Sequence, residues 1–574
     1  MSFPPLPFDW NMQKRKMCAA SLLAGALLPF LPGPGAISCR AQAAPQADHT
    51  VTLAVFSVND FHGSFLADPA KGIPGVVAVC HTLDSLKRVY PYHVTVAAGD
   101  NFGGSYFSTV TEAALLPVMF NEMGITVSAV GNHEFDNGPD FLARRWAGAP
   151  SRPAGWDLTY VCANVTDSLG RSPSYVRPFA VREVKLSPTR SASVAFVGLI
   201  TSTTPEQTRA SNVKGLTFDG RYDVVLDRLK AAPGFDSVRT ADVRLLLTHI
   251  GTRMDGGQAA WDDRDAAHLE TISDTLYHGI LSAHSHQPVC GRVSQGRYPV
   301  VQGEWHGDYI GVMKVLLDTM SMRVVGAEPA LERVPVGRSY TDAEALAWNR
   351  RIDSLMASTR IAGGYPLGRV LATSEAHLTH DRDDKHTFTE LGTLVCESYA
   401  EAYRRTAGAA DDDVVVGVCH YGTVRAPLPM GDVRVMDVGE VLPFSNRIRT
   451  FRMTGAELMR LVEFGLNNRR YGRMQFNGLE VLADSADTFR VHALRYVQPA
   501  TNRRVEIKPD TPCIVAADEF MTTGGDGYPV SLFPDAEEIE ANLPTTTEAF
   551  IQHIQRLGKV CGDPARVRKL IFPK

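Results

Sequence analysis

Five short polar segments, each directly after a predicted β-strand, constrain this chain more than any other feature of its sequence. In order they are Asn59-Asp60-Phe61-His62-Gly63, Gly99-Asp100-Asn101, Gly131-Asn132-His133-Glu134, Thr248-His249 and Ala283-His284-Ser285-His286. Ligands of open α/β sheets bind at the carboxyl ends of the strands, so we expect these segments to meet at one edge. The chain is therefore predicted to form a layered α/β domain with a polar site at that edge.

The predicted strands are β-branched runs in the first half of the chain, and helical patterns separate several of them. The strands are expected at 51–58, 93–98, 126–130, 158–163, 193–200, 243–247 and 279–282, with further strands at 309–317 and 323–331. Helices are expected at 112–123 and 139–146. This alternation is typical of an α/β fold.

The residue types in the five segments are those that hold divalent cations. Asp60 and His62 are two residues apart, so in extended backbone they point the same way and can grip one ion. Asp100 has two oxygens and can bridge two ions. Mixed imidazole, carboxylate and amide ligands suit zinc, manganese or iron, whereas magnesium prefers shells made of oxygen alone.

The order of the segments resembles the calcineurin-like metallophosphoesterases: Asp-x-His, Gly-Asp, Gly-Asn-His-Glu, a lone His, then His-x-His. Ala283 stands where that family usually has Gly. The resemblance implies two divalent ions that activate a nucleophile and neutralise charge during in-line displacement at phosphorus. It assigns one ion to Asp60, His62, Asp100 and His286, and the other to Asp100, Asn132, His249 and His284. His133 is then expected to be catalytic, with Asp136 fixing the tautomer of its ring.

Three segments of the second half are similar to the carboxyl-terminal domain of the 5'-nucleotidase family. They are residues 422–425, 442–446 and 520–528, and the combined resemblance covers about residues 50 to 535. It implies that Phe444 and Phe520 sandwich a nucleobase, that Asp526 binds ribose hydroxyls, and that Arg425 binds phosphate or ribose oxygens. The implied fold is a four-layer α/β/β/α sandwich followed by a smaller α+β substrate-binding domain.

Two departures from the family leave the substrate open. His420 and Tyr421 stand where the family often has Asn and Gly, and Lys385 replaces an arginine, keeping the charge but losing the planar fork. Hydrolysis of 5'-nucleotides is the leading hypothesis. The alternatives are a 2',3'-cyclic-nucleotide phosphodiesterase or 3'-nucleotidase, a nucleotide-sugar hydrolase, a thiosulfohydrolase-like enzyme, and a non-catalytic nucleoside-binding protein.

The length of 574 residues exceeds what one core usually fills, so two domains are expected. We predict a metallophosphoesterase domain at 44–338, a linker helix within 339–364 and a substrate-binding domain at 365–574. The helix itself is expected at 342–357, with Thr341 or Asp342 as its amino cap. In the resembled family this linker acts as a hinge, and we expect the same here.

The first 43 residues have the pattern of a secretory signal peptide. Lys14-Arg15-Lys16 precedes an apolar run at 18–31, and Ala41-Gln42-Ala43 fits a cleavage site. Lipidation at Cys39 is the alternative. Either way the protein is expected to be exported to the periplasm or cell surface, and no later segment has the ~20 apolar residues of a membrane helix.

Charge and cysteine usage limit the expected partners. The net charge of -5 gives no basic domain for a nucleic-acid polymer, so a nucleotide or another small phosphoester is the expected partner.

Of the nine cysteines, seven lie beyond Cys39 and show no paired spacing. The odd number leaves at least one unpaired within the chain, and we expect most to be small buried residues.

Overall fold

The computed structural model describes residues 49–69, 71–142, 158–208, 210–272, 276–361, 364–381, 384–410, 412–485, 488–539, 541–567 and 569–572. The expected signal segment at 1–43, including Cys39, lies outside the described residues, as do the last residues of the helix expected at 139–146.

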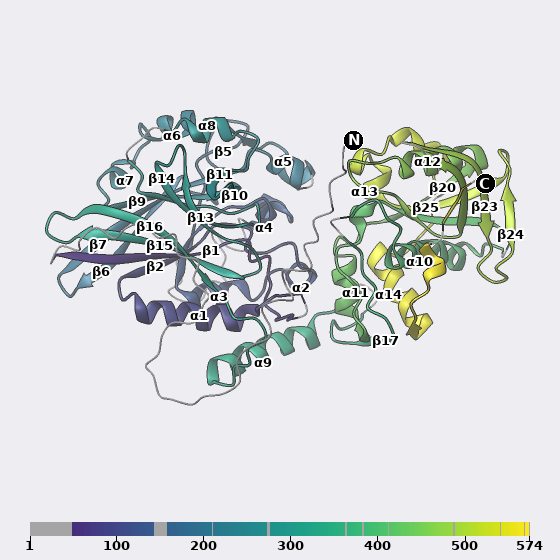
Figure 1. The fold of residues 1–574 in the computed structure, drawn as a ribbon, viewed down its shortest axis with the longest axis horizontal. Helices are drawn as coiled ribbons and strands as arrows, with labels where there is room; N and C mark the ends of the chain where they lie inside the picture. The colour runs from purple at the N-terminus through teal and green to yellow at the C-terminus, as the bar shows by residue number, and fades with distance from the viewer. Residues whose placement is uncertain are drawn as a thin grey trace, which may run out of the picture. The chain divides into compact units, whose positions relative to one another are not determined.

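Two six-stranded sheets form the first lobe (Figure 1). The strand order of the first sheet is β16 (Arg323–Arg333), β15 (Tyr309–Asp318), β1 (Thr50–Val58), β2 (His93–Ala97), β3 (Ile125–Ala129) and β4 (Thr159–Val161). That of the second is β13 (Pro288–Val293), β14 (Tyr298–Gly303), β12 (Gly279–Leu281), β9 (Val243–His249), β7 (Arg190–Ile200) and β6 (Phe179–Ser187). Each strand expected from the sequence is present, with its ends shifted by a few residues at most.

The two sheets pack face to face, and helices cover their outer faces. Leu53 and Val55 of β1 belong to the same buried core as Phe196 of β7 and Leu245 of β9. Helices α1 (Gly75–Val89) and α3 (Leu116–Met123) cover the first sheet, while α6 (Tyr222–Leu229), α7 (Asp236–Arg239) and α8 (Ala266–Glu270) cover the second (Figure 1). The predicted four-layer α/β/β/α sandwich is confirmed.

Strand direction brings the polar segments to one edge of the sandwich. β1, β2 and β3 run parallel in the first sheet, and β7, β9 and β12 run parallel in the second. The last six residues of β1 are all buried, as expected for a strand covered on both faces. Five polar segments therefore leave the carboxyl ends of β1, β2, β3, β9 and β12.

One predicted helix begins in the wrong place. The apolar periodicity predicts a helix from residue 112, but α3 begins at Leu116 and a separate short helix, α2 (Tyr106–Val110), precedes it. Glu112 and Ala113 have φ values of 50° and 52°, in the left-handed region that an α-helix excludes. The apolar side chains continue their pattern through a turn.

Helix α9 (Ala343–Ser358) packs on the first lobe. Asp342 is its amino cap and accepts a hydrogen bond from the Ala345 amide at 3.0 Å. Trp348 is fully buried and stacks on Phe65, and Arg351 forms an ion pair at 2.7 Å with Glu122 of α3. Trp348 and the Arg351–Glu122 ion pair therefore hold α9 against the first lobe. The hinge role expected for this helix stays a prediction.

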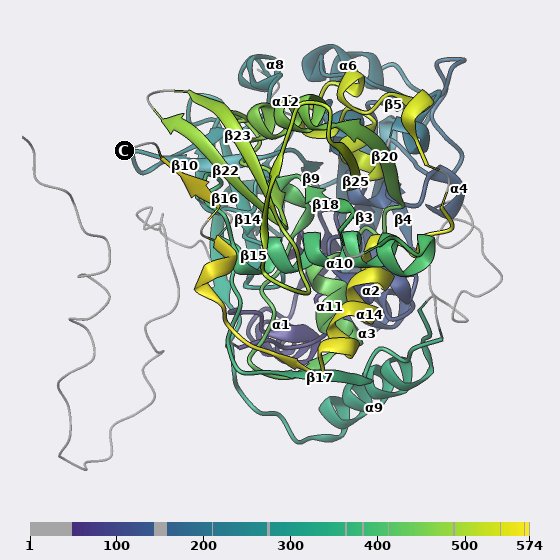
Figure 2. The ribbon, with the colours of Figure 1, turned by 90° about the vertical axis from the view of Figure 1, so that its right-hand side faces the viewer.

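The second lobe is α+β, as expected. Its three sheets have the orders β19 (Gly431–Arg434), β17 (Val370–Ser374), β26 (Lys559–Val560); β20 (Ile448–Thr454), β25 (Pro512–Asp518), β18 (Val414–Cys419), β21 (Gln475–Phe476); and β24 (Arg504–Ile507), β23 (Phe489–Val497), β22 (Leu479–Ser485), β27 (Leu570–Ile571). Its longer helices are α10 (Glu390–Ala407), α11 (Val435–Val441), α12 (Gly455–Leu466) and α14 (Thr546–Leu557), and α10 and α14 lie side by side (Figure 2).

The remaining elements are short: α4 (Pro139–Leu142), β5 (Val165–Thr166), α5 (Thr204–Gln207), β8 (Thr217–Phe218), β10 (Thr252–Asp255), β11 (Gln258–Trp261) and α13 (Glu519–Thr522). No helix among the described residues combines the length and hydropathy needed to cross a membrane. Six of the seven cysteines in the described residues are buried, as expected, and Cys561 is exposed. The sulfurs of Cys396 and Cys419 lie 3.6 Å apart, a proximity that their spacing in the sequence did not indicate.

Candidate metal centre

The polar segments converge into compact groups of side chains with metal-ligand chemistry. Asp60, His62 and His286 form one group, and their ligand atoms all lie within 4.8 Å of one another. A second group, by the same measure, contains Asp100, His249 and His284. The remaining expected ligand, Asn132, joins this group because its Oδ1 lies 3.2 Å from Nε2 of His249. The structure thus brings together all seven side chains that the sequence singled out.

Short distances within the cluster suit shared cations. Nε2 of His62 lies 3.0 Å from Nε2 of His286, and Oδ1 of Asp60 lies 3.6 Å from the same His286 atom. Nε2 of His249 lies 3.2 Å from Oδ2 of Asp100. Asp60 and His249 are fully buried. Buried polar groups this close to one another need a compensating charge, which a divalent cation provides.

Strained backbone holds most of these ligands. Asp60, His62, Asp100, His284 and His286 all have positive φ values, between 47° and 83°. Such conformations cost about 1–3 kcal/mol each and persist only where the surrounding structure enforces them. The sequence argument that Asp60 and His62 share a direction through extended backbone was therefore wrong. They meet because two left-handed residues turn the chain immediately after β1.

Electrostatics keep the imidazoles of His284 and His286 available as ligands, whereas that of His249 is protonated until a cation binds. Burial lowers the pKa of His284 to about 3 and that of His286 to about 4, so both rings are neutral at physiological pH. Burial also lowers the pKa of His249, but the adjacent Asp100 carboxylate more than offsets this and raises it to about 9. Burial raises the pKa of Asp60 to about 7, against the opposing effect of His249. A bound cation would displace protons from these groups.

Hydrogen bonds outside the cluster fix the orientation of the ligands. Nδ1 of His249 lies 2.9 Å from the Ala98 carbonyl, so Nδ1 donates a proton to that oxygen and Nε2 faces the cluster. Asp60 accepts hydrogen bonds from the Asn59 side chain at 2.8 Å and from the His284 amide at 3.0 Å. Both carboxylates of the cluster are therefore fixed by buried neighbours.

Glu134 was not assigned a role from the sequence. It is fully buried, and its carboxylate accepts hydrogen bonds from the amides of Asp100 and Asn101, both at 2.9 Å, and of Gly131 at 2.6 Å. It thereby ties the loop after β3 to the loop after β2. Its place in the Gly-Asn-His-Glu segment was the available signal, because a buried carboxylate must find such donors.

Close approach explains one glycine of the cluster. A Cβ atom at Gly131 would lie 2.1 Å from Oδ1 of Asp100, well inside van der Waals contact. The loop after β3 can therefore approach the Asp100 carboxylate only if this residue has no side chain.

His133 and Asp136 form the pair that the sequence suggested. Nδ1 of His133 lies 2.6 Å from Oδ2 of Asp136, and the His133 amide donates a hydrogen bond to Oδ1 of Asp100 at 2.9 Å. Burial opposes protonation of His133, but Asp100 and Asp136 raise its pKa to about 10. Its side chain remains 27% exposed, so a protonated imidazole faces the rim of the cluster.

The aromatic residues singled out in the second lobe are exposed and not part of a core. Phe444 is 50% exposed, with the Arg425 guanidinium 5.4 Å from its ring centre. Phe520 is 45% exposed, and the His420 ring lies 4.9 Å from it. Nδ1 of His420 lies 2.6 Å from Oδ2 of Asp526. We use the name aromatic surface for two groups of residues, Arg425 with Phe444, and His420 with Phe520 and Asp526. Lys385 is exposed.

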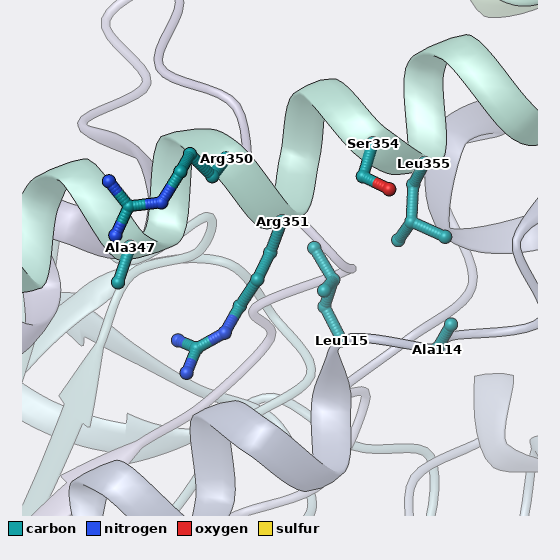
Figure 3. Close-up of a pocket in the computed structure, with 7 residues that line it drawn as sticks. All are labelled: Ala114, Leu115, Ala347, Arg350, Arg351, Ser354 and Leu355. Atoms are coloured by element: carbon teal, nitrogen blue, oxygen red, sulfur yellow. The ribbon is translucent and has the colours of Figure 1, made fainter.

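The hollow in Figure 3, about 530 Å³ in volume, is not part of either group. It lies between α9 and the turn before α3, and its lining consists of Ala114, Leu115, Ala347, Arg350, Arg351, Ser354 and Leu355. None of these residues belongs to the metal-ligand groups.

The four-layer sandwich has histidines and carboxylates at the carboxyl ends of its parallel strands, which is the arrangement that the resemblance to calcineurin-like metallophosphoesterases led us to expect. Residues 370–532 match the family described as the 5'-nucleotidase C-terminal domain. The second lobe therefore contains the match to this C-terminal domain, and the chain as a whole is similar to 5'-nucleotidases.

Individual relatives are distant in sequence. The chain is 24% identical to the trifunctional nucleotide phosphoesterase protein YfkN of Bacillus subtilis, over 92% of this chain but only 36% of that protein. It is 23% identical to a 5'-nucleotidase of Vibrio parahaemolyticus, over 95% of this chain and 98% of that one. The crystal structure of a 5'-nucleotidase precursor from Thermus thermophilus has the same fold, with a TM-score of 0.61 at 21% identity, covering 91% of this chain and 99% of that one.

Proposed function

We propose that this chain is an exported, metal-dependent phosphoester hydrolase that releases phosphate from 5'-nucleotides. The observation that carries the proposal is the convergence of seven ligand-type side chains beside the His133–Asp136 pair. The names of the Bacillus and Vibrio relatives support nucleotides as the substrate class. The signal-peptide pattern at 1–43 supports export.

Two divalent ions fit the cluster. Asp60, His62, Asp100 and His286 would hold one, and Asp100, Asn132, His249 and His284 would hold the other. When bound, the ions would activate a nucleophile and neutralise charge on the phosphate oxygens. Zinc, manganese and iron suit the mixed imidazole, carboxylate and amide donors.

His133 is the proposed proton donor of the reaction. Asp136 accepts the hydrogen bond from Nδ1–H, which leaves Nε2–H free to protonate the oxygen of the departing nucleoside. The raised pKa of His133 keeps this proton in place at neutral pH. The ring is held by the loop that also supplies Asn132, so proton transfer and phosphate binding share one rigid support.

The aromatic surface is the proposed binding site for the nucleoside. Phe444 and Phe520 offer exposed faces for stacking a nucleobase. Arg425 and Lys385 supply positive charge for phosphate or ribose oxygens. In this proposal residues 44–338 form the catalytic domain, 339–364 the linker and 365–574 the substrate-binding domain.

A second candidate substrate is a 2',3'-cyclic nucleotide or a 3'-nucleotide. The Asp526 carboxylate is expected to bind ribose hydroxyls, but one of its two oxygens, Oδ2, already lies 2.6 Å from Nδ1 of His420. An unmodified ribose therefore meets fewer open acceptors than the family pattern implies. A substrate esterified at the ribose hydroxyls does not need them.

One panel tests the proposal. Purified protein is analysed for metal, and the hydrolysis products of AMP, ATP, UDP-glucose and 2',3'-cyclic AMP are then separated and quantified, with and without a chelator. The products are phosphate from AMP and ATP, UMP and glucose phosphate from UDP-glucose, and a nucleoside monophosphate from the cyclic nucleotide. We expect two bound ions, the highest kcat/KM with AMP, and loss of turnover on chelation. Absence of both metal and turnover would contradict the proposal and favour a non-catalytic nucleoside-binding protein. Faster hydrolysis of UDP-glucose or of the cyclic nucleotide than of AMP would change the proposed substrate but would agree with metal-dependent phosphoester hydrolysis.

A further inference from the structure

A loop that the sequence analysis did not single out forms a wall of the metal centre. It comprises residues 304–308, between β14 and β15. The His306 amide donates a hydrogen bond to the Asp60 carbonyl at 2.8 Å, and Nδ1 of His306 lies 2.5 Å from Oγ of Ser64. The side chain of Asn59 donates to the Glu304 carbonyl at 2.7 Å. The loop is therefore attached at three points to the segment that carries Asp60 and His62.

The backbone of this loop is turned so that one side chain faces the centre. Glu304 and His306 have φ values of 62° and 50°, so left-handed residues flank Trp305 on both sides. Two such residues in succession around one side chain are costly, and the hydrogen bonds to the ligand segment enforce them. The conformation serves to direct the Trp305 indole.

The indole stacks on one proposed ligand. The ring centres of Trp305 and His286 are 4.6 Å apart and their planes are inclined by 26°. Of the three tryptophans in the described residues, Trp261 and Trp348 are buried, at 4% and 0% exposure, whereas Trp305 is 39% exposed. Trp305 therefore remains partly exposed to solvent while its ring packs on the imidazole of His286.

His286 is the ligand that needs such support. Its side chain is 34% exposed, while those of Asp60 and His249 are fully buried. An imidazole with this much solvent around it has freedom to rotate. Loss of a group that orients a metal ligand typically lowers metal affinity by about 10–100-fold. Among the described residues, Trp305 makes ring contacts with His286 and His306. In the second group, Asp100 and His249 are buried, and Nδ1 of His249 is fixed by the Ala98 carbonyl.

We propose that Trp305 is a positioning residue for one ion only, the ion held through Asp60, His62 and His286. It acts by stacking on His286 and so limiting rotation of that ring. The two ions of the centre are then held unequally, and the ion beside Trp305 depends on the 304–308 loop. This inference rests on the two-ion centre of the proposed function.

Manganese binding to the full-length apoprotein tests the inference directly. Mn²⁺ alone is titrated into wild type, W305A, W305F and M320A, with calorimetry for affinity and electron paramagnetic resonance for free ion. M320A is the matched control, because Met320 is an exposed apolar residue of the same lobe, between β15 and β16. Where W305A does not fold, W305L, which keeps an apolar side chain but has no ring to stack, takes its place.

We expect wild type and M320A to bind two ions. W305A should bind one ion with unchanged affinity and the other at least tenfold more weakly. W305F, which keeps an aromatic ring, should restore most of the lost affinity. Unchanged binding of both ions in W305A, or equal weakening of both, would overturn the role of Trp305. Wild type that binds no ion would instead contradict the two-ion centre itself.

Discussion

The metal centre and the aromatic surface are organised in opposite ways. The ligands of the metal centre are mostly buried, lie on left-handed backbone and are fixed by hydrogen bonds to buried neighbours. Phe444 and Phe520 are about half exposed, and their contacts are with Arg425 and His420. A rigid site suits a transition state that must be matched closely. An open aromatic surface suits recognition of a base by stacking, which tolerates variation.

The difference predicts that single changes in the metal centre are far more damaging. His284→Ala removes a proposed ligand and should lower kcat/KM for AMP by about three orders of magnitude, since a displaced ion forfeits several kcal/mol of charge stabilisation. Phosphate release and metal content are measured together, with M320A as the control. Unchanged turnover and metal content would remove His284 from the centre.

Removal of the ions should destabilise the first lobe and not the second. A ligand present at 1,000 times its Kd stabilises the state that binds it by about 4 kcal/mol. For a domain of this size that corresponds to a Tm lower by about 10 °C after chelation. Scanning calorimetry of the full chain, with and without chelator, separates the two transitions. Equal shifts of both melting temperatures on chelation would contradict the prediction that bound ions stabilise the first lobe alone.

The His133–Asp136 pair should control the alkaline limit of activity. His133 must be protonated to donate, and its pKa is raised to about 10, so kcat should fall as the pH rises through that value. Asp136→Asn removes a negative charge that favours the protonated imidazole, so the fall of kcat at alkaline pH should begin at a lower pH. A pH–rate profile of kcat measures this. His133→Asn should lower kcat about 100-fold at every pH, which is the usual size of general acid catalysis. A wild-type pH–rate profile in Asp136→Asn would show that the Asp136 carboxylate does not take part in the reaction.

Changes to the aromatic surface should be the mildest. Phe520→Ala removes one stacking face, worth about 1–3 kcal/mol per base, and should raise KM for AMP about tenfold with kcat retained. Glycerol phosphate, which has no base, should be hydrolysed at wild-type efficiency. Val530→Ala is the matched control, because Val530 is 58% exposed in the same lobe. An equal loss with both substrates would argue against base stacking.

Most helices and strands were well predicted because the residue patterns that indicate them lie within each element. The β-branched run at 51–58 corresponds to β1, Thr50–Val58, and the capped helix expected at 342–357 corresponds to α9. The helix expected from residue 112 was misplaced because apolar periodicity does not register the left-handed backbone of Glu112 and Ala113. Side-chain pattern and backbone direction are separate quantities, and only the first is visible in a sequence.

The candidate site was only partly visible for a similar reason. Segments that each follow a strand could be expected to meet, because parallel strands end at one edge. Glu134 and Trp305 were not assigned roles, since both act through neighbours distant in the sequence. Trp305 meets His286 only because the loop after β14 folds back onto the segment after β1. The contact between His420 and Asp526 likewise joins residues 106 positions apart.

The side chains that can bind metal, and the order in which the strands present them, follow from the amino-acid sequence alone. The tertiary structure decided how they do so: through turned, strained loops and not extended backbone, with Asp60 and His249 buried and His286 partly exposed. The physical reason is that ligand type is a local chemical property. Burial, backbone strain and the stacking of Trp305 on His286 arise only when both sheets and their connecting loops are packed together.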